Sequence, residues 1–384
     1  MNWEFTDRVD RVEESATLAV SKRAAAREAE GADVVDLSVG EPDFETPLPV
    51  REAGKGAIDA GHTTYTPANG IRALRAAVAE DLRRRDLDYD PEEVIVTPGG
   101  KQALFETVQA LVEPGDEVVL VDPAWVSYEA MVSLAGGSVV RVDTTPHDFR
   151  LAPALDDLQA VVTDATDLIV VNSPNNPTGA VYSERALAGV RDLAVDHDVP
   201  VISDEIYDRV VYEAEPRSLG SLDGMGDRTV TINGFSKSYA MTGWRLGYLA
   251  APDPLVGAAG KVHSHSVTCA ANFVQHAGVT ALEEVDDAVE RMVASFRERR
   301  DLVVDLLADH GVDVAVPEGA FYVLVPVPVA DDDQSWATDA IDEAGVATVP
   351  GVAFNAPGHV RISYAASRDR LEEGIERLGE HGFL

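Results

Sequence analysis

The feature that most constrains the fold of this sequence is a regular alternation of short Val- and Ile-rich segments with longer amphipathic segments between residues 94 and 249. The apolar segments have the composition of β-strands buried on both faces, and they cover residues 94–97, 117–121, 138–142, 168–172, 199–203, 229–233 and 246–249. The spacing of apolar residues predicts amphipathic helices at 101–112, 126–135 and 183–196. This alternation predicts an α/β fold with a mainly parallel, seven-stranded sheet covered on both faces. The connections between the later strands leave no room for a crossover helix, so at least one strand should run antiparallel.

The two ends of the chain have a different pattern. Before the sheet region, the sequence predicts helices at 16–29, 47–60 and 69–85 and a short strand at 34–39. After Pro254 it is helical up to Gly311, and we then expect a strand at 320–325, a helix near 335–344, a strand at 359–364 and a final helix. We therefore predict a large α/β domain at residues 47–285 and a smaller α+β domain made of residues 1–46 and 286–384. The acidic segment 331–333 is expected to be a solvated loop.

The net charge of the chain is strongly negative. Thirty-one Lys and Arg face 67 Asp and Glu, which gives a formal net charge of −36. Such a surface repels phosphate backbones and anionic lipid surfaces, so it argues against nucleic-acid and membrane partners. Five of the cations are lysines. An acidic surplus with so few lysines predicts a halophilic protein whose stability requires salt.

Cysteine content and the N-terminus indicate the compartment. Cys269 is the single cysteine, which excludes an internal disulfide framework and a zinc site with several cysteines. His263 and His265 have no acidic residue at a convincing ligand spacing, so we expect no metal site. The N-terminus does not resemble a signal peptide, and no apolar run approaches the ~20 residues of a membrane span. We expect a cytoplasmic protein.

The segments that follow the strands carry the chemistry, because ligands of open α/β sheets bind beyond the carboxyl ends of the strands. Residues 98–102, Pro-Gly-Gly-Lys-Gln, open a helix, where bare backbone amides and the helix dipole favour an anion. The sequence contains neither a Gly-x-Gly-x-x-Gly motif nor a P-loop. A phosphate site is therefore expected here without a dinucleotide-binding fold.

Two further strand ends carry polar side chains. Residues 173–179 form a Pro- and Asn-rich turn in which the amide of Asn176 is free to donate to a ligand oxygen. Residues 204–207, Asp-Glu-Ile-Tyr, follow the next strand. A carboxylate such as Asp204 at the end of a buried strand needs a positive partner, and a protonated ring nitrogen would serve.

The segment 233–245 holds Lys237 in an apolar, glycine-punctuated setting. Burial lowers the pKa of a lysine and makes its neutral amine a nucleophile toward an aldehyde. An amine for an aldehyde, a carboxylate for a ring nitrogen and donors for a phosphate are together the parts of a pyridoxal-phosphate site.

The segments 172–179, 203–207 and 236–245 resemble class I aminotransferases of the fold-type I pyridoxal-phosphate family, as do residues 38–44 and 359–364. The resemblance covers essentially the whole chain in order and is strongest to the aspartate aminotransferase branch of bacteria and archaea. It implies pyridoxal 5′-phosphate as the cofactor and a fold-type I architecture.

The resemblance implies a role for each matching residue at the cofactor. Lys237 would bind the cofactor aldehyde and move the proton of the substrate Cα, and Asp204 would keep the pyridine nitrogen protonated. Asn176 and Tyr207 would donate to the phenolate oxygen, and Trp125 would stack on the ring. The phosphate would be held by groups from three segments: the amides of Gly100 and Lys101, the Ser236 hydroxyl and the Arg245 guanidinium.

The resemblance also implies how the substrate carboxylate is held. Arg361 would grip the α-carboxylate, with the Gly40 amide, Asn176 and Trp125 beside it, because a planar guanidinium binds a carboxylate through two parallel hydrogen bonds. Tyr65 matches the tyrosine that reaches the phosphate of the other subunit, which implies a homodimer with shared active sites.

Substrate choice is less constrained. The side chain of Lys101, with Ser15 nearby, resembles the group that recognises a distal carboxylate, which favours aspartate with 2-oxoglutarate in a ping-pong reaction. Ala124 stands where relatives often carry tyrosine, and this wider pocket keeps aromatic, arogenate/prephenate or alanine-type aminotransferases open.

Two alternatives change more than the substrate. A carbon–sulfur lyase or a decarboxylase would use the same lysine and ring partner. The aminotransferase-like part of a transcription regulator would need a basic DNA-binding segment, which the acidic composition opposes.

Overall fold

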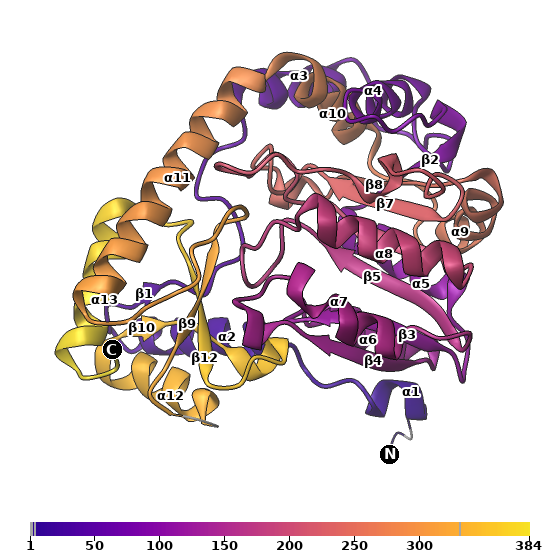
Figure 1. Cartoon of the computed structure of the whole chain (residues 1–384). Coiled ribbons are helices and arrows are strands. Elements are labelled where there is room, and N and C mark those ends of the chain that lie inside the picture. Colours follow the sequence, from indigo (N-terminus) through magenta and orange to yellow (C-terminus); the bar gives the residue numbers. More distant parts are fainter. Residues whose placement is uncertain (1–2, 4, 330–331) are drawn as a thin grey trace.

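The computed structural model describes residues 3, 5–329 and 332–384 (Figure 1). Its large sheet contains β2 (Val94–Thr97), β3 (Glu117–Asp122), β4 (Ser138–Asp143), β5 (Thr166–Asn172), β6 (Val201–Asp204), β7 (Thr229–Gly234) and β8 (Gly247–Ala250). The other strands are β1 (Val35–Asp36), β9 (Tyr322–Pro326), β10 (Val346–Ala347), β11 (Val349–Pro350) and β12 (His359–Ser363).

Helices surround these sheets. The first group is α1 (Asp7–Asp10), α2 (Ala16–Ala29), α3 (Leu48–Asp59), α4 (Arg72–Arg83), α5 (Gly100–Leu111), α6 (Ser127–Ala135), α7 (Leu155–Val161) and α8 (Glu184–Asp196). The second group is α9 (Asp253–Ser266), α10 (Asn272–Glu284), α11 (Asp286–Asp309), α12 (Asp333–Asp339) and α13 (Arg368–Glu380).

The large sheet has the strand order β2-β8-β7-β6-β5-β3-β4. Strand β8 is antiparallel to its neighbours β2 and β7, whereas the pairs among β3 to β7 are parallel. This confirms the predicted α/β class, the mainly parallel seven-stranded sheet and the antiparallel strand.

Side chains that alternate along each strand pack against helices on the two opposite faces of the large sheet. Val118 and Leu120 pack into a cluster with residues of α5, α6 and α9, whereas Val119 and Val121 pack with residues of α7 and α8 on the opposite face. At the β2–β8 end, a third cluster joins the sheet to α4 and α10. Burial on both faces explains why the strands are apolar at nearly every position.

The small sheets lie beside this layered body (Figure 1). Strands β11, β12 and β9 form an antiparallel sheet, and β1 pairs in parallel with β10. Their core contains Phe296 and Phe321 and is closed by side chains of α11, α12 and α13. The domain boundaries at residues 46/47 and 285/286 stay a prediction.

Two local expectations need correction, and a third, the helix near 335–344, is confirmed with more detail. The strand predicted at 34–39 is reduced to β1. The Leu37 amide still donates to the Ala347 carbonyl oxygen at 2.9 Å, but the Ser38 amide and hydroxyl donate to the Asp36 carboxylate and not to a neighbouring strand. The helix near 335–344 begins as α12 at Asp333 and changes to a wider π-helical turn at Ala340–Ala344. The solvated loop is wrong at Asp333, which is buried and accepts the Val352 amide at 2.6 Å. Asp331 lies outside the described residues.

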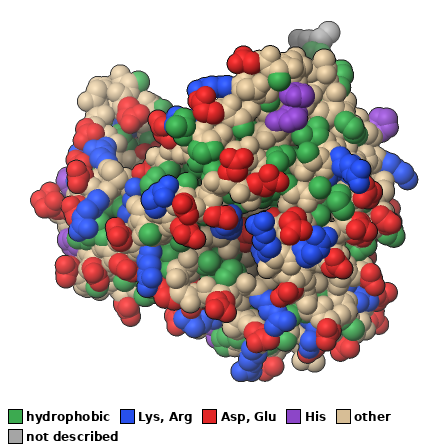
Figure 2. All heavy atoms as spheres, turned by 90° about the horizontal axis from the view of Figure 1, so that it is seen from above, with side chains coloured by type: hydrophobic (Ala, Val, Ile, Leu, Met, Phe, Trp, Pro, Cys, Tyr) green, Lys and Arg blue, Asp and Glu red, His purple; other side chains and the backbone are tan. Residues whose placement is uncertain are grey.

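Acidic side chains are spread over the face of the molecule in Figure 2, with basic side chains interspersed among them. Within the described residues, no helix combines the length and the apolar character that a membrane crossing requires.

Candidate active site

The carboxyl ends of neighbouring strands meet at one edge of the large sheet, and hydrogen bonds tie them together. Asn172, the last residue of β5, donates to the Asp204 carbonyl oxygen at 2.9 Å, and its own side-chain oxygen accepts the Asn176 amide at 2.9 Å. The end of β5 therefore positions both the turn that carries Asn176 and the end of β6.

Lys237 follows β7, is partly buried, and its amine lies among aromatic rings. Its Nζ donates to the Gly40 carbonyl oxygen and lies 5.9 Å and 5.8 Å from the ring centroids of Tyr207 and Phe321. It forms no ion pair with any carboxylate in the described residues. Burial, assisted by the positive charge of Arg361, lowers the pKa of Lys237 to about 8. About a tenth of the amine is therefore neutral at pH 7.

Asp204 is a buried carboxylate that forms no ion pair with any residue that the structure describes. Its Oδ2 accepts the Tyr128 hydroxyl at 2.7 Å, and its Oδ1 accepts the Ile206 amide at 3.2 Å. Burial raises the pKa of Asp204 to about 6, and the hydrogen bond from Tyr128 opposes this rise. A positive group placed against this carboxylate would lower its pKa again and favour the charged form.

Tyr207 lies beside these groups and is itself buried. Its hydroxyl is 2.9 Å from the hydroxyl of Tyr322. Burial raises the pKa of Tyr207 well above its ordinary value, so the phenol keeps its proton and can donate a hydrogen bond.

Arg361 on β12 is a buried cation that also lacks an acid. Its Nη2 donates to the Ser38 carbonyl oxygen at 2.7 Å and its Nη1 to the Asn176 side-chain oxygen at 3.0 Å, while its Nε has no partner in the described residues. Its guanidinium carbon lies 4.4 Å and 5.1 Å from the ring centroids of Tyr322 and Phe354. Burial lowers the pKa of Arg361. A guanidinium held in this way is suited to a carboxylate supplied by a ligand.

A cradle of glycine backbone lies at the start of α5. Gly99 has a φ of +94°, and a Cβ at this position would lie 2.6 Å from an Arg245 nitrogen. A Cβ on Gly247 would lie 2.3 Å from the Gly100 amide nitrogen. The missing side chains leave the amides at the helix start and the Arg245 guanidinium close to one another, an arrangement that suits an anion. Ser236 is buried next to Lys237 in the chain.

Trp125 and Lys101 lie together. The Nζ of Lys101 is 4.6 Å from the centroid of the Trp125 ring, and burial followed by the charge of Arg245 lowers the pKa of Lys101. Ala124 is buried, and its amide donates to the Phe354 carbonyl oxygen at 3.1 Å.

Two predicted residues are not joined to this group by any contact among the described residues. Ser15 stands at the N-terminus of α2 without a side-chain cap and has no hydrogen bond to Lys101. The Tyr65 side chain is 85% exposed. Its loop is held in place, because Asn272 donates to the Thr64 carbonyl oxygen at 3.1 Å and Gln275 donates to the Thr66 hydroxyl at 3.1 Å.

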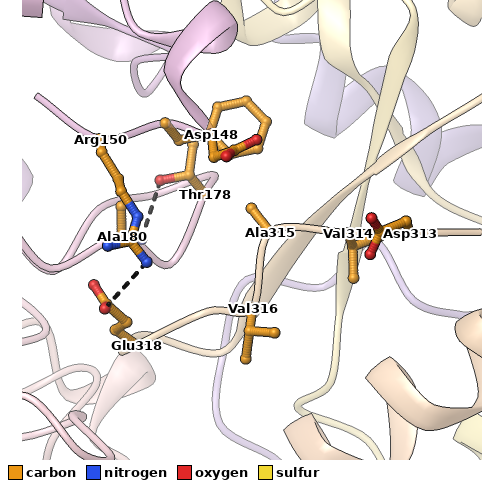
Figure 3. Close-up of a pocket in the computed structure, with 10 residues that line it drawn as sticks. Asp148, Arg150, Thr178, Ala180, Asp313, Val314, Ala315, Val316 and Glu318 are labelled. Carbon is orange, nitrogen blue, oxygen red and sulfur yellow. Dashed lines mark hydrogen bonds and ion pairs between the residues drawn. The ribbon is translucent and has the colours of Figure 1, made fainter. Parts of the chain in front are cut away.

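A separate cavity of about 220 Å³ lies next to the turn that carries Asn176 (Figure 3). It is lined by Asp148, Phe149, Arg150, Thr178, Ala180, residues 313–316 and Glu318, and an ion pair between Arg150 and Glu318 at 3.6 Å lies beside it. Its described lining includes none of the predicted site residues, so it is distinct from the strand-end site.

Comparison with known proteins identifies the fold and the site together. Residues 32–378 match the family model described as Aminotransferase class I and II. The chain belongs to this family. It is therefore an aminotransferase, and the cofactor of its family is pyridoxal 5′-phosphate.

Relatives cover almost the full length of this aminotransferase. The aspartate/prephenate aminotransferase of Thermus thermophilus is 45% identical over 97% of both chains, and the aspartate aminotransferase of Thermotoga maritima is 41% identical over 97% of both. The solved structure of the Thermus thermophilus aspartate aminotransferase with maleate has a TM-score of 0.95 at 43% identity and covers 99% of this chain and 100% of its own.

The residues present fit pyridoxal phosphate. Among the described residues, the amine of Lys237 has no acid and the carboxylate of Asp204 has no base. These two groups and the glycine cradle at the start of α5 are complementary to an aldehyde, a ring nitrogen and a phosphate. The structural class predicted from the sequence, the enzyme class and the cofactor are confirmed. The roles of single residues stay predictions.

Sequence reasoning missed two tyrosines of the aminotransferase site. Tyr128 donates to Asp204, and Tyr322 contacts both Tyr207 and Arg361. Tyr128 lies in the first turn of α6, three residues after Trp125, and the two ring centroids are 5.4 Å apart, so this spacing could have placed Tyr128 beside Trp125. Tyr322 stands in an apolar strand, and nothing in the sequence around it marks it as a site residue.

Proposed function

We propose that this aminotransferase transfers the amino group of aspartate to 2-oxoglutarate in two successive half-reactions. The observation that carries the proposal is Arg361, a buried guanidinium with no acidic partner in the described residues and an Nε left without an acceptor. A second cation, Lys101, stands over Trp125 and suits the distal carboxylate of a dicarboxylic substrate. The names of the Thermus and Thermotoga relatives, which are aspartate aminotransferases, support this choice.

When bound, pyridoxal phosphate supplies a ring that accepts the electron pair released when the substrate Cα loses its proton. In this proposal, Arg361 and the Gly40 amide bind the α-carboxylate and orient the Cα–H bond. Lys237, neutral in part because its pKa is lowered to about 8, takes the Cα proton.

The remaining residues orient and tune this chemistry. Asp204 holds a proton at the ring nitrogen, and Asn176 and Tyr207 donate to the phenolate oxygen. Trp125 covers the ring face. The phosphate is bound by the amides of Gly100 and Lys101, the Ser236 hydroxyl and Arg245.

The test is a panel of amino acids assayed with 2-oxoglutarate in concentrated KCl. We expect aspartate to have the highest kcat/KM, and no measurable turnover of aspartate would contradict the proposal. Release of pyruvate and ammonia from cystathionine without an oxo acid would instead favour a carbon–sulfur lyase.

A second candidate acceptor is prephenate or an aromatic oxo acid. Ala124 is a small buried residue preceding Trp125, and the Thermus relative is named an aspartate/prephenate aminotransferase. An aromatic aminotransferase of Pyrococcus horikoshii also has a TM-score of 0.88 at 40% identity, covering 94% of this chain and 100% of its own. Transamination of prephenate with a kcat/KM near that for oxaloacetate would establish this activity.

We also propose that the active enzyme is a homodimer that works in concentrated salt in the cytoplasm. Support for the dimer comes from Tyr65, whose exposed ring lies on an ordered loop. Mixing inactive Tyr65→Ala and Lys237→Ala chains should restore activity if sites are shared, because one site of the mixed dimer then has both residues.

The charge of −36 supports the salt requirement. A melting temperature that fell as KCl rose to molar levels would contradict it.

A further inference from the structure

Glu205, the residue after Asp204 in the chain, is buried and belongs to a cluster of ion pairs. The Glu205 carboxylate is buried and accepts the Ser203 hydroxyl at 2.8 Å and the Ser218 hydroxyl at 2.5 Å. Its second oxygen accepts Arg85 at 3.1 Å. Burial raises the pKa of Glu205, and the charge of Arg85 acts against that rise.

Arg85 joins this carboxylate to two other segments. The Arg85 Nη1 also donates to the Asp208 carboxylate at 2.7 Å, and its Nη2 donates to the Tyr248 hydroxyl at 3.2 Å. Tyr248 stands on β8 directly after Gly247, which packs on the glycines of the anion cradle. One guanidinium therefore contacts the turn after β6 and the strand that supports the cradle.

Asp208 extends the connection to the lysine segment. Its Oδ1 accepts the Arg209 amide at 2.9 Å and the Ser238 hydroxyl at 3.4 Å. Ser238 is the residue after Lys237, and Asp208 is the residue after Tyr207. The segments that carry Lys237, Tyr207 and Asp204 therefore meet at this cluster, although none of these three side chains belongs to it.

We infer that Arg85 is a positioning residue of the cofactor site: by binding Glu205 and Asp208 together it holds the turn 204–208 against the Lys237 segment and strand β8. The inference rests on the proposed roles of Asp204, Tyr207 and Lys237. Arg85 contacts no group assigned to the cofactor or the substrate, so it acts through the backbone segments that it joins. A buried carboxylate that loses its guanidinium partner is left uncompensated, which displaces the segment that carries it.

The experiment compares Arg85→Met with Arg85→Lys and with the control Arg83→Met. Arg83 is the last residue of α4, two residues before Arg85, and pairs with Glu80 at 2.6 Å on the surface, so its loss tests the general effect of removing an arginine there. The readouts are the dissociation constant of pyridoxal phosphate from absorbance titration, the separate values of kcat and KM for aspartate, and the melting curve.

For Arg85→Met we expect pyridoxal phosphate to bind about tenfold more weakly or worse and kcat to fall by a similar factor, with KM for aspartate within about twofold, because the contacts of Arg361 lie on other segments. Arg85→Lys should recover part of the affinity, and Arg83→Met should match the wild type. Cofactor affinity and kcat of Arg85→Met within about twofold of the wild type would overturn the inference.

If Arg85→Met does not fold, Asp208→Asn decides, because it keeps the size of the side chain and removes its charge. Weaker cofactor binding in a folded Asp208→Asn protein supports the inference, and unchanged binding overturns it. The proposed function fails separately: it fails if borohydride traps no cofactor on the Lys237 peptide of the wild type.

Discussion

Two sets of buried charges in this molecule are treated in opposite ways. Arg300, on α11, is buried and donates to both oxygens of Glu213 at 2.8 Å and 2.9 Å, with a further ion pair to Asp301 at 2.7 Å. Arg361 is also buried and Lys237 is partly buried, but neither forms an ion pair with a described residue. Asp204, a buried carboxylate, likewise forms no ion pair with a described residue.

The comparison separates charges that serve the fold from charges kept for a ligand. An ion without a counter-charge in the protein interior is costly, and a fold keeps one only where something else compensates it. At the carboxyl ends of the strands, the Lys237 amine, the Arg361 guanidinium and the Asp204 carboxylate each lack a counter-ion among the described residues. An amino acid and its cofactor together carry groups that complement all three. Around Arg300, the chain supplies its own acids.

The largest effect that follows from this comparison is expected for Lys237→Ala. Removing the amine takes away the group proposed to bind the aldehyde and to move the Cα proton, so turnover should fall by about 10⁴-fold. Lys261→Ala, at an exposed lysine of α9, is the matched control and should stay within about twofold. Turnover of Lys237→Ala near the wild-type rate, measured with aspartate and 2-oxoglutarate, would refute the role of Lys237.

The next effect contrasts Arg361 with Arg300. Arg361→Lys should lower kcat/KM for aspartate by about 10²-fold, because an ammonium cannot form the two parallel bonds of a guanidinium. Arg300→Lys should leave kcat/KM almost unchanged.

The free energy of unfolding should respond in the reverse order, with a larger loss when Arg300 is replaced than when Arg361 is replaced. Arg300→Met should lower the free energy of unfolding by about 2 kcal/mol, through lost bonds to charged partners. Arg361→Met should not destabilise the protein, since it removes an uncompensated buried charge. Chemical denaturation in constant salt measures both, and equal losses in the two variants would break the comparison.

A pH effect of intermediate size is expected for cofactor capture by the apoprotein. The pKa of Lys237 is lowered to about 8, so the neutral amine is a growing fraction as pH rises and becomes the major form above that value. Well below pH 8, the rate of cofactor attachment should rise by about tenfold per pH unit. Above pH 8, the rate should level off. Stopped-flow absorbance between pH 6 and pH 9.5 measures this, and a rate that still rises by about tenfold between pH 8.5 and pH 9.5 would mean that the pKa of Lys237 is not lowered.

The smallest effect is expected for Tyr128→Phe. This change removes one hydrogen bond to Asp204, so the pKa of Asp204 should rise further above its value of about 6. Cofactor affinity should fall by about fivefold, which corresponds to about 1 kcal/mol. Tyr89→Phe, which removes a buried hydroxyl bonded to the Thr229 carbonyl oxygen at 3.3 Å, is the control and should not change the affinity.

Much of the site could be predicted because it is made of strand ends. Asp204 and Lys237 each follow an apolar strand, and the parallel arrangement brings such ends to one edge of the sheet. Arg85 could not be found in this way. It follows a surface helix and has the local sequence of an exposed arginine, yet it contacts Glu205 and Asp208 more than a hundred residues away.

Asp333 shows the same limit from the other direction. Its acidic neighbours predict a solvated loop, but its carboxylate is buried because it accepts the amide of Val352, which belongs to a distant turn. A neighbourhood in the sequence indicates polarity, whereas burial depends on which backbone donor the fold brings near.

The sequence by itself determined the order and kind of the elements around the large sheet, because the period of apolar residues reports which faces of a segment are buried. It also determined the chemical groups at the strand ends. Only the tertiary structure decided which of the buried and partly buried charges have partners: Arg300 and Arg85 are paired, and Arg361, Lys237 and Asp204 form no ion pair within the part of the chain that the structure describes. Ion pairs between residues far apart in the chain depend on distances of a few ångströms, and a one-dimensional pattern does not contain those distances.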